Sequence, residues 1–405
     1  MSFPFRYSRT AQGMRPSPIR ELFKLIQRPG MISFAGGLPD PAIFPVREFA
    51  ECSSILSEKG PVVLQYGATE GWAPLVDELR ARMEKPLGRP IAADEVLISA
   101  GSQQVMDLLS RVLIDPGDVV ITEAPTYPGA LHTFRNQGAR FALVPCDDQG
   151  MQVDRLPEVL ERCRKDTGRL PKLIYSIVNF SNPSGACLSA ARRPVLAEIA
   201  ERFGVPVLED DPYGEVRYQG QPPPTVFSAA KAGIVFASSF SKILAPGVRV
   251  AWVVADRELI RKMAIAKQGM DLCTSVVAQA LVAEYCKRGH LDAHLGRIRA
   301  HYARKADAMA AALRGALPEG SAKWVNPEGG FFFWLEMTAG DSRALFERAL
   351  DKGVAFLPGD TCFPSRDETV GEPVDGSRYA RLCFTFAQPP EIEQGARRLA
   401  SALGS

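Results

Sequence analysis

The sequence predicts an α/β protein whose core is a mostly parallel sheet covered by helices. From about residue 47 to 290, helical patterns alternate with short segments that are apolar almost throughout, as expected of strands buried on both faces. The candidate strands are EVLIS (95–99), DVVIT (118–122), RFALV (140–144), KLIYSIV (172–178), VPVLED (205–210), GIVFAS (233–238) and RVAWVV (249–254). We therefore expect a large domain at 47–290 with a seven-stranded sheet.

The segments on either side of this region have a different character. Residues 1–46 form an arm in which Ser17-Pro18, a good N-cap followed by proline at the first helical position, opens a short helix. After the sheet region, a long charged helix, the apolar stretch GGFFFWLEM and a last helix from about residue 389 predict a smaller α+β domain at 291–405. Within that domain, residues 364–378 are rich in Pro, Gly and Asp and predict an exposed loop.

The composition indicates a folded protein of balanced charge. Of the 405 residues 46% are apolar, and 48 basic residues against 46 acidic ones leave a net charge of +2. This balance excludes disorder and provides no overall field that would attract nucleic acid or a membrane surface. No apolar run approaches the roughly 20 residues that span a bilayer. We expect neither a nucleic-acid nor a membrane partner.

The cysteines and the N-terminal residues predict a cytoplasmic location for the protein. The eight cysteines are scattered and form no CxxC pair, which is typical of thiols kept reduced. The N-terminus lacks the apolar block of a secretory signal. Three arginines and no acidic residue among its first 16 residues leave an organellar transit peptide open as the alternative.

Polar residues follow several of the predicted strands, at the edge where ligands of doubly wound sheets bind. After the first strand, Gly101 and Ser102 open a helix whose free N–H groups suit a phosphate, although a plain turn with Ser102 as N-cap explains them as well. Tyr127, after the second strand, either stacks on a planar ligand or is an aromatic side chain packed against the protein. Asn182, after the fourth strand, lies in a tight turn of a common kind.

Two further strand ends carry charge. Glu209, Asp210 and Asp211 end one buried strand, and such a run is costly unless a cation meets one of them or the loop is solvated. Lys242 follows the next strand among hydroxyl groups. Desolvation there would lower the pKa of the amine and make it a nucleophile toward carbonyls, whereas the alternative is a lysine that reaches solvent.

Taken together, these strand ends match the needs of one cofactor chemistry. A phosphate site, an aromatic plate, an amide, a carboxylate and a desolvated lysine are what a phosphorylated pyridine aldehyde requires. The lysine would form the Schiff base, and the carboxylate would hold the pyridine nitrogen protonated so that the ring accepts electrons.

Nearly the whole chain resembles the class I/II aminotransferases of fold type I, which depend on pyridoxal 5'-phosphate, and within them the 2-aminoadipate/kynurenine aminotransferase branch. The segments that carry the resemblance are SPIRE (17–21), FAGGLPDP (34–41), LQYGATEG (64–71), AGSQQ (100–104), EAPTY (123–127), FSNPSG (180–185), EDDPY (209–213), SSFSK (238–242) and YARLCFTF (379–386). The resemblance implies a fold type I PLP-dependent transferase that forms a homodimer with shared active sites.

The resemblance also assigns roles around the cofactor ring. Lys242 would be the Schiff-base lysine and proton shuttle. Asp210 would pair with the pyridinium nitrogen, because the family's Asp-x-x-Tyr spacing selects it over its neighbour. Tyr213 and Asn182 would hydrogen-bond the phenolic oxygen, and Tyr127 would stack on the ring.

The remaining roles concern the phosphate and the substrate. The phosphate would be held by Ser102, Gln103, Ser239, Ser241 and Arg249. Tyr66 would reach it from the partner subunit. Arg381 would bind the substrate α-carboxylate in a bidentate contact through its guanidinium group, assisted by Asn182 and Gly37. Arg20 matches the position where this branch places an arginine near a distal substrate carboxylate, or it lies on a solvated helix face.

The function implied is transfer of an amino group between an L-amino acid (2-aminoadipate, glutamate, aromatic or branched-chain) and a 2-oxo acid such as 2-oxoglutarate. The alternative on the same scaffold is a PLP-dependent lyase or decarboxylase. A transcriptional regulator would need a DNA-binding module, for which the 16 residues before the first family-like helix leave no room. A NAD-dependent dehydrogenase is disfavoured because no GxGxxG follows a strand.

One group of residues imitates a metal site. His290 and His294 are spaced i,i+4, with Cys286 one turn before and His301 two turns after. No HExxH glutamate and no acidic cluster accompanies them, so we expect a helix surface and no bound metal.

Overall fold

The computed structural model describes residues 5–14, 16 and 29–404. The predicted helix that opens at Ser17-Pro18, together with Arg20, lies outside the described residues.

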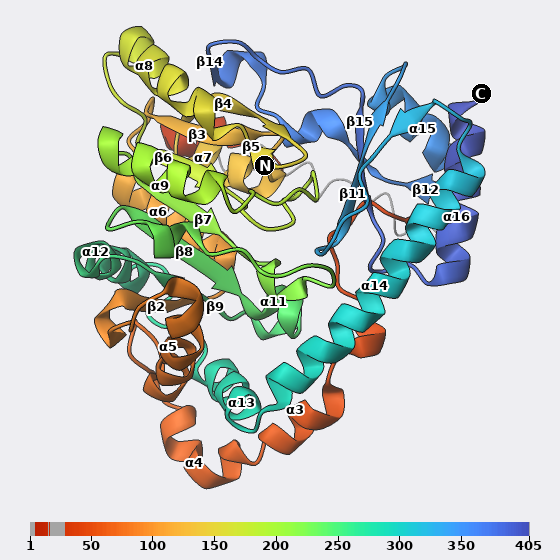
Figure 1. Cartoon of the computed structure of the whole chain (residues 1–405). Coiled ribbons are helices and arrows are strands. Elements are labelled where there is room, and N and C mark those ends of the chain that lie inside the picture. The colour runs from red at the N-terminus through yellow and green to blue at the C-terminus, as the bar shows by residue number, and fades with distance from the viewer. Residues whose placement is uncertain (1–4, 15, 17–28, 405) are drawn as a thin grey trace.

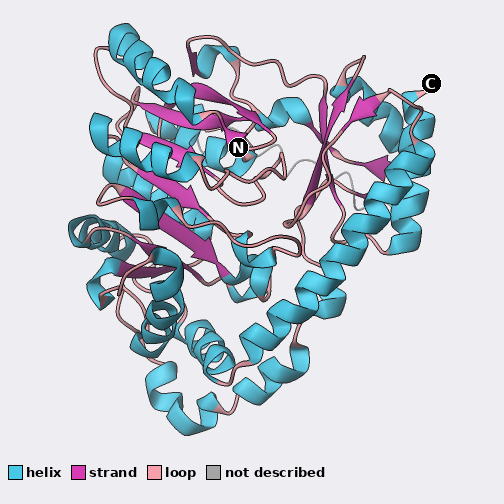
Figure 2. Ribbon diagram, viewed as in Figure 1, coloured by secondary structure: helices cyan, strands magenta, loops and turns pink. Residues whose placement is uncertain are grey.

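The large sheet contains all seven predicted strands, and the α/β class is confirmed (Figure 2). Its order is β14 (Thr369–Val370), β4 (Arg140–Asp147), β3 (Val119–Ala124), β6 (Leu173–Ser176), β7 (Val207–Asp210), β8 (Ile234–Ser239), β9 (Ala251–Val254) and β2 (Val96–Ser99). The strands from β14 to β8 are parallel, whereas β9 runs antiparallel to both of its neighbours. Every residue of β2, β3, β6, β7, β8 and β9 is buried, which explains their continuously apolar patterns.

Two short strands that we did not predict extend this sheet. β5 (Gly150–Met151) pairs with the end of β4. β14 comes from residues 364–378, and the prediction of an exposed loop is wrong there: Thr369 and Val370 are buried and pair with β4. Two β-branched residues are too short a run to show a strand pattern, and only the open edge of β4 makes them one.

Helices form a layer on each face of the large sheet (Figure 1). One layer holds α6 (Ser102–Leu113), α7 (Pro128–Asn136) and α12 (Arg257–Gln268), and α6 contacts both of the other two. The other holds α5 (Ala73–Leu87), α8 (Leu156–Thr167), α9 (Arg192–Phe203) and α10 (Val226–Ala229). At the lower edge lie α3 (Val46–Cys52), α4 (Ile55–Val63) and α13 (Val276–Lys287), and behind the sheet the short α1 (Arg9–Gly13).

The long α14 (His290–Ala316) leads from α13 to a second group of elements (Figure 1). An antiparallel sheet in the order β10 (Ala322–Lys323), β11 (Phe332–Met337), β15 (Tyr379–Cys383) and β13 (Leu357–Pro358) lies there. A parallel pair joins β1 (Ile32–Ser33) to β12 (Val354–Ala355). α15 (Ser342–Asp351) and α16 (Pro389–Leu403) pack against each other, and α16 also packs along α14. The predicted last helix is therefore confirmed.

The expected surface position of the histidines on α14 is wrong for His294. Its side chain is buried edge-on against Tyr285, and burial lowers the pKa of the imidazole to about 4. The prediction failed because α13 covers this face of α14, which the i,i+4 spacing cannot show. Over the described residues no group of three or more His, Cys, Asp or Glu side chains is placed to hold a metal, and no helix is long and apolar enough to cross a membrane.

Candidate active site

Lys242 lies directly beyond the carboxyl end of β8, on the short helix α11 (Phe240–Ile243). Its Nζ donates to the carbonyl of Gly37 at 2.7 Å and lies 5.5 Å from the ring centroid of Phe331 and 6.0 Å from that of Tyr213. Burial among these groups lowers the pKa of the amine to about 8. Its one hydrogen-bond acceptor among the described residues is a neutral carbonyl, so no carboxylate meets the charge of this amine.

The three carboxylates that end β7 divide between its two faces. Glu209 accepts the amides of Val226 and Phe227 at 2.9 and 2.8 Å, and so caps α10. Asp211 accepts the amide of Gly214 at 2.8 Å and closes a turn. Backbone N–H groups therefore meet two of the three charges, and the buried cation Arg193 also favours the charged form of both carboxylates.

Asp210 is the exception. Its Oδ2 accepts from Tyr175 Oη at 2.8 Å, whereas its buried Oδ1 has no hydrogen-bond partner among the described residues. Burial raises the pKa of Asp210 to about 7, although the hydrogen bond from Tyr175 lowers it. A buried acceptor without a donor is destabilising, so this oxygen is suited to a protonated ring nitrogen.

Two residues that the sequence analysis missed support this site. Tyr175 stands in an apolar strand, and only the pairing of β6 with β7 brings its hydroxyl to Asp210. Glu123, at the end of β3, accepts from Ser176 Oγ at 2.6 Å and from Ser181 Oγ at 3.2 Å, which fixes the turn before Asn182. Burial raises the pKa of Glu123 to about 7. A carboxylate at the end of a buried strand was the available signal.

The predicted phosphate site draws on two places that the sheet brings together. Ser99 and Ser239 pair with the same residue, Ala251, from opposite sides of β9. The N-terminus of α6, which offers free N–H groups, therefore lies beside the start of α11. Ser239 Oγ accepts the amide of Ser241 at 3.0 Å and donates to its hydroxyl at 2.8 Å.

Gly101 and Arg249 complete this predicted phosphate site, which we call the phosphate cradle. Gly101 caps α6 with φ +108°, and a Cβ at this position would collide with the guanidinium of Arg249. Arg249 Nη2 donates to the carbonyl of Ala100 at 2.8 Å. The N-cap is Gly101, so the alternative with Ser102 as N-cap is wrong. The side chain of Gln103 is turned to α7, where it donates to the carbonyl of Gly129 at 3.2 Å and to the hydroxyl of Thr133.

Arg381 and Asn182 meet across the gap between the two sheets. Arg381, on β15, donates through Nη1 to Asn182 Oδ1 at 2.6 Å and through Nη2 to the carbonyl of Ala35. Its guanidinium carbon lies 4.4 Å from the ring centroid of Phe332. The buried Nε has no partner among the described residues, so this cation retains a donor for an anion.

The aromatic residues of the prediction occupy different environments. Tyr213 is buried, with its ring edge-on to Phe331 at 5.4 Å between ring centroids. Tyr127 precedes α7 at the end of β3 and is half-buried, with its ring beside Gly129. Tyr66 is 78% exposed in the loop after α4, as expected of a residue that would act on another subunit.

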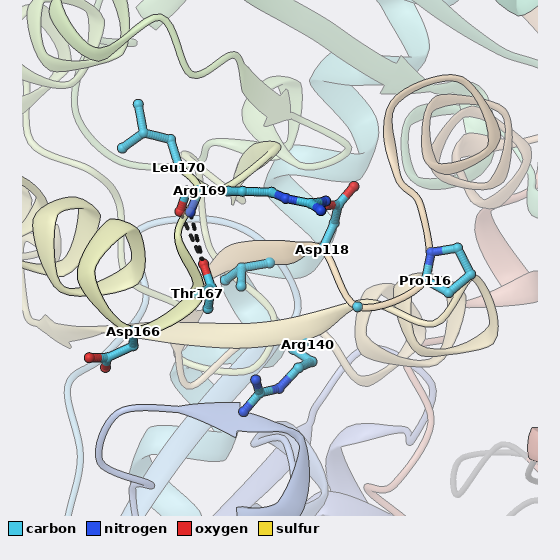
Figure 3. A pocket seen from close by; sticks show the side chains of 9 residues that line it. Pro116, Asp118, Arg140, Asp166, Thr167, Arg169 and Leu170 are labelled. Atoms are coloured by element: carbon cyan, nitrogen blue, oxygen red, sulfur yellow. Dashed lines mark hydrogen bonds and ion pairs between the residues drawn. The ribbon is translucent and has the colours of Figure 1, made fainter.

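A pocket also lies at the amino ends of the strands of the large sheet, opposite the candidate active site. A pocket of about 330 Å³ opens at the amino ends of β3 and β4, where Arg169 pairs with Asp118 at 3.5 Å (Figure 3). Because β3, β4 and β6 are parallel, this edge is remote from the carboxyl ends that carry Asp210 and Lys242. The pocket therefore belongs to another part of the molecule.

The arrangement at the carboxyl ends fits pyridoxal 5'-phosphate. The unpartnered Oδ1 of Asp210 suits the pyridinium, the depressed pKa of Lys242 suits attack on the aldehyde, and the N-terminus of α6 with Arg249 suits the phosphate. This set of groups on a mostly parallel sheet defines a PLP enzyme of fold type I.

Comparison with known proteins gives the family. The family model of aminotransferase class I and II matches residues 40–399, so the chain belongs to that family. It is 40% identical to aromatic-amino-acid aminotransferase 1 of Thermococcus litoralis (98% of this chain, 94% of that protein). It is 41% identical to 2-aminoadipate transaminase of Thermus thermophilus (100% and 98%).

A solved structure agrees with these relatives. Kynurenine aminotransferase of Pyrococcus horikoshii, crystallised with PMP, superposes with a TM-score of 0.91 at 40% identity, over 98% of this chain and 96% of that one. The chain is a PLP-dependent aminotransferase, and nothing in these findings favours the alternative of a lyase or decarboxylase.

The pKa of Lys242 predicts how the cofactor-free protein takes up pyridoxal phosphate. Only the neutral amine attacks an aldehyde, and burial brings the pKa from 10.5 to about 8. We expect the rate of cofactor capture, followed by absorbance after mixing, to rise with pH around a midpoint near 8 and to level off above it. A rate that keeps rising to pH 10 would contradict the lowered pKa of Lys242.

Proposed function

We propose that the chain moves the amino group of an L-amino acid of the 2-aminoadipate, glutamate, aromatic or branched-chain type to a 2-oxo acid such as 2-oxoglutarate. The observation that carries this proposal is the convergence of Lys242, Asp210 and Arg381 from three elements on one space. The printed names of the relatives, which cover aromatic and aminoadipate substrates, support this range of donors.

Different side chains of the protein have different roles in the proposed reaction. When bound, the cofactor supplies an electron sink for the charge that develops at the substrate α-carbon. Lys242 Nζ would be the base that takes up the substrate α-proton and the acid that gives it back. Asp210 Oδ1 keeps the ring nitrogen protonated. Arg381 binds the α-carboxylate and orients the Cα–H bond toward Lys242.

The other predicted contacts surround this centre. The groups that would hold the phosphate are Ser102, Gln103, Ser239, Ser241 and Arg249. Tyr127 would stack on the ring, and Tyr213 with Asn182 would bind the phenolic oxygen. Gly37 assists in substrate binding, and Arg20 is the candidate for a distal substrate carboxylate.

We also propose a homodimer with shared active sites. Four apolar side chains, Leu64, Tyr66, Met270 and Leu272, are 72%, 78%, 39% and 48% exposed. The two segments that carry them are close together, since a Cβ on Gly67 would touch Val276 at the start of α13. Gln104 of α6 donates to Asp271 at 2.8 Å, so this apolar rim borders the phosphate cradle. A partner seated there would bring its Tyr66 toward the cradle.

Two broader expectations belong to the same proposal. The eight scattered cysteines, all of them free thiols in the structure, support a cytoplasmic location. The arm 1–46, the large domain 47–290 and the small domain 291–405 remain our division of the chain, and α14 begins at its second boundary.

The proposed reaction predicts a reversible spectral change. A productive donor should bleach the visible band of the holoenzyme, and 2-oxoglutarate should restore it, because the two half-reactions are separate. Absorption spectra recorded with single amino acids would rank the donors. Lys242→Ala should show no turnover, and full turnover by that variant would disprove the role of Lys242.

The choice of Asp210 predicts a contrast with its neighbour. Asp210→Asn removes the charge that keeps the ring nitrogen protonated, so kcat should fall at least about 100-fold while the protein still binds cofactor. Asp211→Asn retains an oxygen for the Gly214 amide and should keep kcat within about threefold. Steady-state kinetics of both variants test this, and equal losses would mean that Asp210 was chosen wrongly.

The homodimer predicts that a charge in the apolar rim separates the subunits. Leu64→Glu would place a carboxylate in a buried interface and should shift the mass in sedimentation or light scattering from dimer to monomer. Val195→Glu on α9, at a position that is 40% exposed, is the matched control and should stay dimeric. A wild-type monomer at micromolar concentration contradicts the proposal.

A further inference from the structure

Outside the active site, the chain buries a cluster of polar groups around Asp40. Asp40 and Lys305 are 1% and 2% exposed and form an ion pair. The same carboxylate lies 2.9 Å from His301 Nε2 and accepts from Gln388 Nε2 at 3.2 Å and the amide of Ala42 at 3.0 Å. Burial alone would raise the pKa of Asp40, but these contacts, Lys305 above all, lower it to about 2.

This cluster joins parts of the chain that are far apart in sequence. Lys305 lies on α14, and its Nζ also donates to the carbonyl of Thr385, after β15, at 2.7 Å. The hydroxyl of Thr385 donates to the carbonyl of Leu38. Tyr302 Oη, one turn before Lys305, accepts the amide of Asp40 at 3.1 Å. The segment at Asp40 is therefore tied both to α14 and to the residues that follow β15.

Residues 35–40 also face the active site. The carbonyl of Gly37 accepts from Lys242 Nζ at 2.7 Å, and the carbonyl of Ala35 accepts from Nη2 of Arg381. The segment is anchored at its start by the pairing of β1 with β12 and at its end by Asp40. The positions of both carbonyls therefore depend on how well the Asp40 end is held.

A buried ion pair is seldom the most stabilising way to fill a core, because apolar residues of similar volume often do as well or better. Its use here is explained by the geometry that it imposes. We propose that the Asp40–Lys305 pair positions residues 35–40, so that the carbonyls of Ala35 and Gly37 orient Arg381 and Lys242 for the reaction. Asp40 and Lys305 are positioning residues, and this inference rests on the proposed function.

Loss of the pair should affect substrate binding more than cofactor binding. In Asp40→Asn holoenzyme we expect KM for the amino acid to rise about tenfold or more, because the guanidinium of Arg381 loses its fixed orientation. kcat should fall by less, and the visible band of the bound cofactor should be retained. A variant with both kinetic constants within twofold of wild type and only a lowered Tm would overturn the inference.

A second variant guards against simple misfolding. Asp40→Leu combined with Lys305→Met removes both charges and leaves neither unpaired, so it should fold and still show the raised KM. Glu368→Gln breaks a half-buried ion pair elsewhere, with Arg135 of α7, and is the matched control: its Tm should fall while KM stays unchanged. Wild-type KM in the double variant would also overturn the inference.

A measurement independent of turnover completes the test. Hydrogen–deuterium exchange of the peptide that covers residues 34–42 should be slow in wild-type protein and at least about tenfold faster in Asp40→Asn. Unchanged exchange would show that Asp40 does not hold the segment. If the wild-type holoenzyme turns over no amino acid, the proposed function fails, and this inference with it. If wild type turns over and the Asp40 variants match it, the inference alone fails.

Discussion

The register of strands β7, β8, β9 and β2 is the constraint on which the site depends. Parallel pairing aligns Asp210 with Ala237, and Lys242 follows five residues later, beyond the same edge. The antiparallel β9 then links β8 to β2 through Ala251. A shift of one residue in either pairing would turn Asp210 to the wrong face or separate the two halves of the phosphate cradle.

The apolar character of these strands explains why the chemistry lies at their ends. The strands are buried on both faces, so a charged side chain is tolerated only where backbone N–H groups or a neighbouring hydroxyl can meet it. Glu209 and Glu123 are satisfied in this way. Asp210 keeps one oxygen without a partner among the described residues, at a cost of about 1–3 kcal/mol that a bound pyridinium would remove.

The substrate side of the site is built by contacts between distant parts of the chain. Arg381 comes from β15, its partner Asn182 from the turn after β6, and Ala35 from the N-terminal segment. α14 and the Asp40 cluster hold that segment against the rest of the molecule. Binding of the α-carboxylate and the position of Lys242 are thereby connected through residues 35–40, which touch both groups.

The amino-acid sequence by itself determined the seven main strands, the helices between them and the residues at their ends. These follow from local periodicity and from the placement of Asp210, Lys242 and Gly101 after apolar runs. Tertiary structure alone decided which of three adjacent carboxylates keeps an oxygen without a hydrogen-bond partner among the described residues, and that Tyr175 donates to its other oxygen. It alone also decided that Thr369 and Val370 form an edge strand and that His294 is buried. The physical reason is that a side chain's partner is set by strand register and helix packing, which join residues that no local pattern relates.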